Sequence, residues 1–338
     1  MLPEKSNGEN VENKTEELLH WADEKEVISS NKPLLLVFSL MRKLPACLVF
    51  ILSYPIAFFF SIFSRRGRIE SKNYQKQMKK FTGGKIPFRI SPFRQILSFS
   101  FCVMEKMEGW LGNYHYKDLV THDDDLKMLQ NQLEEGRGAL FIGSHLGNIE
   151  LLRSLSSFGE NGVARKISVT VIMELKSTEQ FNRTLQEVNP NAGFQVIDPG
   201  EISINTMVDL QEQIENGGLV VVAGDRTSAR SRSRIIREKF LGKEADFPYG
   251  VFVLALLLKA PVYYLFGLRT KTASLSPKYH LFVEKSKVDF EASHSRRDEK
   301  IHALCKEFVD KLEKYCVQFP YQWYNFYNFW KLSDGVAK

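Results

Sequence analysis

Hydrophobic and polar positions follow two different patterns along the chain, and the change falls near Tyr116. Before it, residues 44–63 form a run of 20 residues without a charge, which is the length needed to cross a hydrocarbon core. After it, short apolar runs separated by amphipathic stretches predict alternating strands and helices. The pattern therefore predicts an α/β domain, a central mixed sheet flanked by helices, behind an N-terminal membrane-associated helical segment.

The predicted elements can be placed from apolar runs and the turn residues that bound them. The apolar runs predict strands at 139–143, 167–173, 194–197, 218–223, 262–268 and 279–284. The amphipathic stretches predict helices at 124–135 and 202–215, and a further helix from about Gly147. Repetition of strand, helix and strand indicates a sheet covered on both faces.

Four segments follow from these changes in pattern. They are a polar tail at 1–32, a hydrophobic membrane anchor at 33–66, a basic helical connector at 67–116 and a catalytic domain at 117–338. Pro45 and Pro55, with cations on both sides of the apolar run, leave open whether it spans the membrane or lies in one leaflet. Ten Lys and Arg residues between Arg65 and Arg94 predict that the catalytic domain lies on the cytoplasmic side of the inner membrane.

Composition narrows the classes of partner. The formal net charge of +6 is a mild excess that suits an anionic membrane surface or a phosphorylated ligand, and it does not indicate a nucleic-acid binder. The four cysteines form no CxxC pair, so the sequence indicates neither a zinc ribbon nor a disulfide scaffold. The scattered cysteines fit a protein in the reducing environment of the cytosol.

The segment GSHLGNIE, residues 143–150, places a histidine directly after a buried strand. A hydroxyl is a poor nucleophile at neutral pH, so acyl transfer to it needs a base, and neutral His145 is suited to that role. If Gly147 makes a turn, Glu150 can accept a hydrogen bond from one N–H of the imidazole and fix its tautomer. Asn148 is a candidate substrate contact. The plainer alternative is that His145 caps a helix and Glu150 is a solvated acid of its first turn.

A second segment, GDRTSARSRSRIIR at 224–237, also follows a buried strand and should lie near the first. Its arginines can bind phosphate or carboxylate oxygens, which predicts an anionic ligand. The candidate substrate-binding residues here are Asp225, Arg226, Arg230 and Arg232. The alternative is a basic loop that rests on lipid headgroups. Near the C-terminus, seven aromatics in residues 321–330 predict either a packed domain end or one wall of an acyl-chain pocket.

Together these motifs resemble the late acyltransferases of lipid A biosynthesis, within the lysophospholipid acyltransferase superfamily. The chain is especially similar to the predicted acyltransferases of aryl polyene and flexirubin gene clusters. The resemblance covers nearly the whole chain and rests on short motifs in a fixed order: HW at 20–21, SHLGNIE, GDR, FLG at 240–242, FPYG at 247–250, PVYYLF from Pro261, and QWYNFYNFW at the end.

The resemblance implies a glycerolipid acyltransferase-like fold, with His145 and Glu150 as the catalytic pair and Asp225 and Arg226 on the acceptor side. It also implies an acyl carrier protein or coenzyme A thioester as donor, a lipid or glycolipid hydroxyl as acceptor, and no metal or other cofactor. The chain departs from the family pattern at two places. Glu150 stands where the wider superfamily more often has Asp, and the second block reads GDRTS instead of the EGTRS-like form of glycerol phosphate acyltransferases. The identity of the acceptor is therefore open. The rival function is a non-catalytic membrane adaptor that binds lipid or carrier protein. A third possibility, a metal-dependent hydrolase that uses His145, Glu150 and Asp225, would need more metal ligands of suitable spacing than the sequence offers, so it ranks last.

Overall fold

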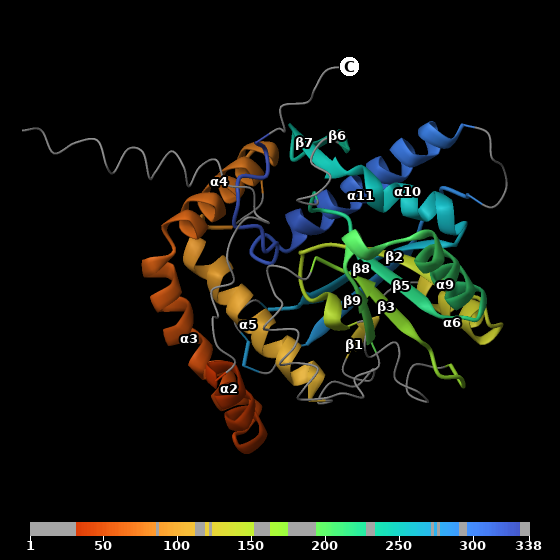
Figure 1. The fold of residues 1–338 in the computed structure, drawn as a ribbon. Helices are drawn as coiled ribbons and strands as arrows, with labels where there is room; N and C mark the ends of the chain where they lie inside the picture. Colours follow the sequence, from red (N-terminus) through yellow and green to blue (C-terminus); the bar gives the residue numbers. More distant parts are fainter. Residues whose placement is uncertain are drawn as a thin grey trace, which may run out of the picture.

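The computed structural model describes residues 32–85, 88–111, 119–121, 124–151, 163–174, 194–227, 234–271, 274–275, 278–290 and 296–331. A central sheet carries helices on both faces, and a separate group of helices stands beside it (Figure 1). The expected α/β architecture with a large mixed sheet is therefore confirmed. Most of the polar N-terminal segment, and Arg230 and Arg232, lie outside the described residues.

The central sheet has seven strands in the order β1-β9-β8-β2-β5-β3-β4. Neighbouring strands run parallel except β8 and β9, which are antiparallel. The carboxyl ends of β2 and β5 therefore lie side by side in the middle of the sheet. The strand bounds are β1 (Leu119–Thr121), β2 (Ala139–Gly143), β3 (Val169–Ile172), β4 (Phe194–Ile197), β5 (Leu219–Ala223), β8 (Val262–Arg269) and β9 (Tyr279–Lys285).

Alternation along β2 shows how the sheet builds two cores. Leu140 and Ile142 face a large cluster with helices α9 (Ile204–Glu215), α10 (Tyr249–Leu258) and α11 (Arg297–Gln318). Phe141 faces a second cluster with α6 (Asp124–Glu134). Because successive strand residues point to opposite faces, a continuous apolar run such as ALFIG is the signature of a strand buried on both sides. The 3-10 turns η3 (Ile149–Leu151) and η4 (Pro199–Glu201) connect elements at the carboxyl edge of the sheet.

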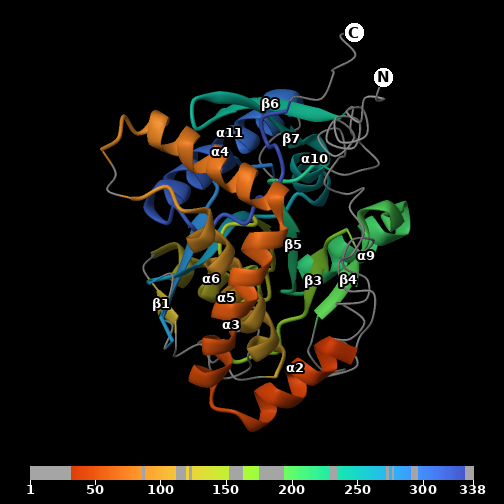
Figure 2. The ribbon, with the colours of Figure 1, turned by 90° about the vertical axis from the view of Figure 1, so that its left-hand side faces the viewer.

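The N-terminal helices α2 (Lys32–Lys43), α3 (Ala46–Phe63), α4 (Arg65–Phe81) and α5 (Pro92–Trp110) form a layer beside the sheet. Figure 2 shows α3 running alongside α5, with α4 turned across the top of the molecule. Within the described residues, no single helix is long and apolar enough to cross a membrane. Cys47–Phe63 and Arg65–Phe81 pass that test only together, as a pair bent by 95°.

A buried ion pair joins this helical layer to the sheet. Arg269, at the end of β8, places Nε 2.6 Å from the Glu105 carboxylate of α5, and both side chains are almost fully buried. The Arg269 guanidinium also lies over the rings of Phe101 and Phe50, at 4.5 and 5.4 Å from their centroids. Burial raises the pKa of Glu105 to about 7, although Arg269 and a hydrogen bond with Tyr279 oppose the change.

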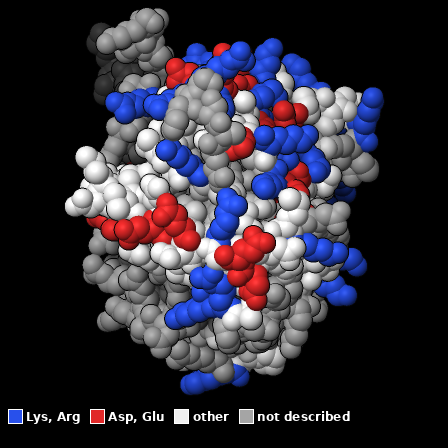
Figure 3. All heavy atoms as spheres, turned by 90° about the vertical axis from the view of Figure 1, so that its right-hand side faces the viewer, with Lys and Arg blue, Asp and Glu red and all other residues white. Residues whose placement is uncertain are grey.

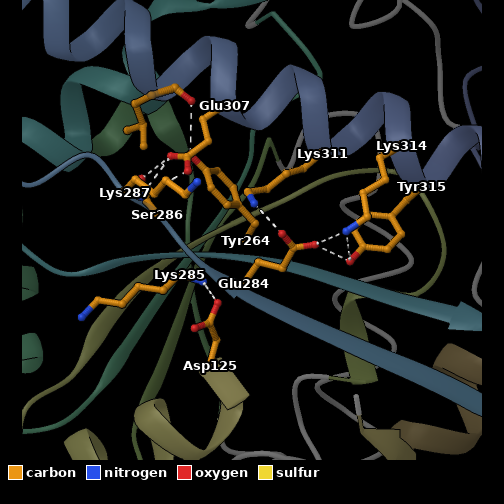
Figure 4. Close-up of polar contacts among 11 residues, drawn as sticks. Asp125, Tyr264, Glu284, Lys285, Ser286, Lys287, Glu307, Lys311, Lys314 and Tyr315 are labelled. Carbon is orange, nitrogen blue, oxygen red and sulfur yellow. Dashed lines mark hydrogen bonds and ion pairs between the residues drawn. The ribbon is translucent and has the colours of Figure 1, made fainter. Parts of the chain in front are cut away.

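Polar contacts hold α11 against the β8–β9 edge (Figure 4). Glu284 of β9 accepts hydrogen bonds from Lys311, Lys314 and the Tyr315 hydroxyl, the Lys314 bond being 2.9 Å long. Burial would raise the pKa of Glu284, but these bonds outweigh it and hold the pKa at about 2. Glu307 of α11 likewise accepts hydrogen bonds from the Tyr264 hydroxyl of β8, and from the Ser286 hydroxyl and the Lys287 backbone amide just after β9. The anchoring of α11 fixes where the aromatic C-terminal segment begins.

The strands β6 (Ile235–Phe240) and β7 (Lys243–Pro248) form an antiparallel hairpin that the sequence analysis did not predict. Its two-residue turn uses positive φ angles of 49° at Leu241 and 76° at Gly242. Gln77 of α4 donates to the Leu241 carbonyl at 2.6 Å, and the Leu241 amide donates to Glu313 of α11 at 2.7 Å. The hairpin thus bridges α4 and α11 over one end of the sheet.

Candidate active site at the ends of strands β2 and β5

The candidate site lies where β2 and β5 end together. Gly143 pairs with Ala223 at the last register position, and the Gly224 amide donates to the Gly143 carbonyl at 2.9 Å. His145 follows β2 by two residues and Asp225 follows β5 by two residues. The pairing therefore brings two residues that are far apart in the sequence to one point at the carboxyl edge, where α/β proteins commonly bind ligands.

His145 and Asp225 make a double contact. The His145 Nδ1 lies 2.9 Å from Asp225 Oδ1, and the His145 backbone amide donates to Oδ2 of the same carboxylate at 2.9 Å. The Asp225 side chain is 1% exposed, whereas 34% of the His145 side chain is exposed. One carboxylate thus fixes both the main chain and the ring of His145, and the ring keeps an accessible edge.

The electrostatics favour a neutral imidazole beside an ionised carboxylate. Burial lowers the pKa of His145 and Arg226 lowers it further, while Asp225 acts in the opposite direction. Burial alone would raise the pKa of Asp225, but His145, Arg226 and a hydrogen bond from Trp323 hold it below its ordinary value. A carboxylate at Nδ1 requires the proton on Nδ1, which leaves the lone pair of Nε2 to act as a base.

The C-terminal segment supports this pair from the side. Trp323 donates its indole N–H to Asp225 Oδ2 at 3.0 Å, and it forms an antiparallel bridge with Leu146. The Tyr324 amide donates to the His145 carbonyl at 2.9 Å, and the Gly147 amide donates to the Gln322 carbonyl at 2.8 Å. The turn after β2 is therefore held on both sides, by β5 and by residues 322–324.

Comparison with known proteins decides the family. Residues 98–332 match the model of the bacterial lipid A biosynthesis acyltransferases, a span that contains both strand-end turns and the aromatic segment. The chain belongs to this family. It is accordingly an acyltransferase of lipid biosynthesis. No curated protein matches the sequence.

The second sequence motif lies beside the first, as expected. Asp225, predicted as an acceptor-binding residue, contacts the His145 ring, and its role toward the acceptor stays a prediction. Arg226 is half-buried, donates to the Tyr324 carbonyl at 3.2 Å and lies 5.9 Å from the centroid of the Tyr327 ring. Arg237 pairs with Asp246 across the hairpin, at 2.9 Å, so among the described arginines of the motif Arg226 and Arg237 have different partners.

The remaining predicted residues lie on the turn after β2. Gly147 has a φ of 76°, which confirms the turn that the pairing of histidine and acid required. Asn148 is buried, and its backbone N–H donates to the Gly267 carbonyl of β8 at 2.8 Å. Glu150 lies in η3, and its side chain is outside the described residues, as is most of the helix expected after Gly147. The roles of Asn148 and Glu150 stay predictions.

Sequence reasoning missed the polar role of the C-terminal aromatic run. Trp323, Tyr324 and Tyr327 all contact the turns that carry His145 and Asp225. The run is also a packed end of the domain, since Trp323 is fully buried. The available signal was the presence of N–H and O–H groups in that run, because buried Trp and Tyr side chains need polar partners.

Proposed function

We propose that this acyltransferase moves a fatty acyl group from a thioester of acyl carrier protein or coenzyme A to a hydroxyl of a lipid or glycolipid acceptor. The observation that carries the proposal is the His145–Asp225 pair at the joined ends of β2 and β5. The lowered pKa of His145 favours a neutral ring, and the ring is oriented and accessible; these are the three properties a general base needs. The proposed fold is glycerolipid acyltransferase-like, in agreement with the resemblance noted above.

In the proposed reaction, His145 Nε2 takes the proton of the acceptor hydroxyl while the hydroxyl oxygen attacks the thioester carbonyl carbon. The new C–O bond forms, the tetrahedral intermediate collapses and the C–S bond breaks. The imidazolium then returns its proton to the leaving thiolate. Asp225 stabilises the imidazolium in the meantime through Nδ1, as the acid of a Ser-His-Asp triad does. Acyl transfer needs no covalent acyl-enzyme in this scheme.

The part of Glu150 is proposed separately, because Asp225 already holds Nδ1. Glu150 belongs to the same motif as His145 and is the middle residue of η3. Replacing each acid by its amide separates the two roles. If Asp225 is the partner of the ring, Asp225→Asn lowers kcat much more than Glu150→Gln. The opposite ranking would return the orienting role to Glu150.

The acceptor is proposed to carry an anionic group that Arg226 binds. Arg226 follows Asp225 directly and is oriented by Tyr324 and Tyr327. Arginine presents a planar fork of donors that matches phosphate and carboxylate oxygens. A phosphate held there would stand beside the catalytic pair, which places the acceptor hydroxyl near Nε2. Arg230 and Arg232 are proposed as rim contacts to the acidic carrier protein or to lipid headgroups, with Asn148 as a further substrate contact.

Attachment to the bacterial inner membrane is proposed to use α3 and α4 together. Only one stripe of α3 is buried, comprising Val49, Phe50, Ser53 and Ala57, and most of its other apolar side chains are exposed. Helix α4 instead exposes a stripe of lysines at positions 72, 76, 79 and 80. Acidic and basic side chains are interspersed over the face that carries α9 (Figure 3). An apolar helix followed at 95° by a basic one fits a chain that lies in one leaflet, with α4 on anionic headgroups.

The test of the catalytic proposal is the lipid mass profile of cells that lack the gene and are complemented with variants. Wild type should restore an acylated species that His145→Ala does not restore. His302→Ala is the control, because His302 is an exposed histidine on α11. General-base catalysis is worth about 10² to 10⁴ in rate. If His145→Ala restores the species as well as His302→Ala does, the protein acts without this base, as the adaptor hypothesis requires.

The membrane proposal is tested by fractionation of the full-length protein. Phe59→Asp with Phe63→Asp should shift it from the membrane pellet to the supernatant after an alkaline wash. Replacing Lys72, Lys76 and Lys79 by Glu should instead reduce binding to vesicles containing anionic phosphatidylglycerol and leave binding to neutral phosphatidylcholine vesicles unchanged. Retention of the double Asp variant in the pellet would show that α3 is not the anchor.

A further inference from the structure

Trp323 occupies a fixed position between the catalytic pair and the helical layer. Its side chain is fully buried, and its ring meets those of Tyr74, Phe240 and Phe329 edge-on, with centroids 4.9 to 5.0 Å apart. Tyr74 belongs to α4, Phe240 to the hairpin and Phe329 to the end of the chain. With rings on three sides, the indole cannot turn its N–H away from Asp225.

The hydrogen bonds that the Asp225 carboxylate accepts show the chemical consequence of its contact with Trp323. Oδ2 accepts from the Trp323 indole at 3.0 Å and from the His145 amide at 2.9 Å, and Oδ1 faces His145 Nδ1 at 2.9 Å. An indole nitrogen and a backbone amide can only donate, so Oδ2 has no room for a proton of its own. Because the pKa of Asp225 is also held below its ordinary value, its ionised form is favoured, and the proton between Oδ1 and Nδ1 then belongs to the histidine.

We propose that Trp323 is a positioning residue for acyl transfer, whose indole N–H holds the Asp225 carboxylate so that His145 keeps its proton on Nδ1 and its lone pair on Nε2. The inference rests on the proposed function of His145 as general base. The pKa of Asp225 points the same way, since the bond from Trp323 is one of the causes that lower it.

The backbone of the same residue reinforces the arrangement. Trp323 bridges Leu146, and its carbonyl accepts from Gln95 of α5 at 2.6 Å. The neighbouring amide of Tyr324 binds the His145 carbonyl. The side chain of Trp323 therefore aligns the acid, while its main chain and that of Tyr324 align the turn that carries the base. Contacts with Trp323 therefore help to position both Asp225 and the turn that carries His145.

The matched test compares Trp323→Phe with Trp330→Phe. Trp330 lies in the same aromatic cluster, its ring centroid 6.5 Å from that of Trp323, but its indole donates to the Phe240 carbonyl at 3.1 Å and not to Asp225. Both variants lose one indole N–H and the same volume. The assay measures transfer of a labelled lauroyl group, from its carrier-protein and coenzyme A thioesters, to total lipid of the source cells in mixed micelles.

Trp323→Phe should lower kcat by about tenfold or more, since hydrogen bonds to charged groups are worth about that much, with KM for the donor within about twofold of wild type. It should also move the acid limb of the pH profile of kcat/KM to higher pH. An Asp225 carboxylate with one donor fewer attracts the His145 proton more strongly, so the pKa of His145 rises. Trp330→Phe should leave both quantities unchanged. A role in packing alone would lower stability without moving the pH limb.

A second measurement covers the case in which Trp323→Phe does not fold. The protein has four tryptophans, so the full-length chain in detergent micelles gives at most four indole N–H resonances. In Asp225→Ala, the Trp323 resonance should move upfield and exchange faster, and the Trp330 resonance, assigned by its loss in Trp330→Phe, should stay in place. Unchanged indole resonances, or a Trp323→Phe enzyme indistinguishable from Trp330→Phe, would overturn the inference. An active His145→Ala would instead overturn the proposed function.

Discussion

Gly147 is the position where a single methyl group should separate fold from catalysis. It has a φ of 76° and follows His145 by two residues. A Cβ added there would lie 2.1 Å from the Gly267 carbonyl oxygen and 2.7 Å from Cδ2 of Leu268. The oxygen belongs to the buried strand β8 and also accepts from the Asn148 amide, so it cannot move aside alone. Gly147→Ala must therefore displace the turn that carries His145, the proposed base.

The expected size of the effect has two parts. A left-handed backbone costs a residue with a Cβ about 1–2 kcal/mol, which lowers the free energy of unfolding. Relief of the contact with the Gly267 oxygen requires a shift of roughly 1 Å, and a misplacement of that size costs about 10²-fold in rate. Gly147→Ala should lose at least about 1 kcal/mol of stability and about 100-fold in kcat.

Gly84→Ala is the control, because Gly84 has a φ of 73° and open space within 4 Å of the added Cβ, at the end of α4. It carries the backbone strain without the steric contact and without the catalytic turn. The assays are thermal unfolding in micelles and lauroyl transfer at saturating donor. Gly84→Ala should melt lower than wild type but remain fully active. Equal activities of the two variants would refute the link between the Gly147 turn and the base.

Three other variants test charged side chains. Because the pKa of Glu105 in the folded state is about 7, above its ordinary value, the folded chain binds more protons than the unfolded chain between about pH 4.5 and 7. The free energy of unfolding should therefore fall as pH rises through that window, by at most about 3 kcal/mol, and Glu105→Gln should remove this slope from melting curves recorded at pH 5 and 8. Arg226→Ala should lower kcat/KM for the acceptor at both low and high salt. Joint replacement of Arg230, Arg232 and Arg234 by Ala should weaken donor capture mainly at low salt, because salt screens the long-range attraction proposed for these rim contacts. The reverse pattern would assign the inner role to these three arginines and the rim role to Arg226.

Much of the sheet could be predicted from local pattern. The runs ALFIG and LVVVA are continuously apolar and bounded by glycine, and they form the paired central strands β2 and β5. Their pairing also confirms that the two motifs lie together, since His145 follows β2 by two residues and Asp225 follows β5 by two residues. The hairpin of β6 and β7 was missed, because its strands carry several charged residues and its turn contains only one glycine.

The partner of His145 could not be predicted from spacing alone. A histidine followed by an acid five residues later suggests a local pair, and the Glu150 hypothesis rested on that spacing together with the family resemblance. Asp225 is 80 residues away, and it reaches the ring only because β2 and β5 are neighbours in register. Trp323 is still further along the chain, and its indole reaches Asp225 only after α11 has packed on the sheet. Contacts of this kind depend on strand order, which apolar periodicity does not encode.

The position of Trp323 also bears on why the helices proposed to attach to the membrane and the proposed catalytic residues share one fold. Helix α4 turns its lysines outward and Tyr74 inward, where the Tyr74 ring packs on Trp323 at 4.9 Å. Helix α5 holds the Trp323 carbonyl through Gln95, and Arg269 ties α5 to the end of β8. The surface proposed to lie on lipid is thus one aromatic ring away from the residue that holds the Asp225 carboxylate. Because interiors are close-packed and transmit strain, deleting α3 and α4 should reduce the catalytic rate on micellar substrate and not only the attachment to membranes.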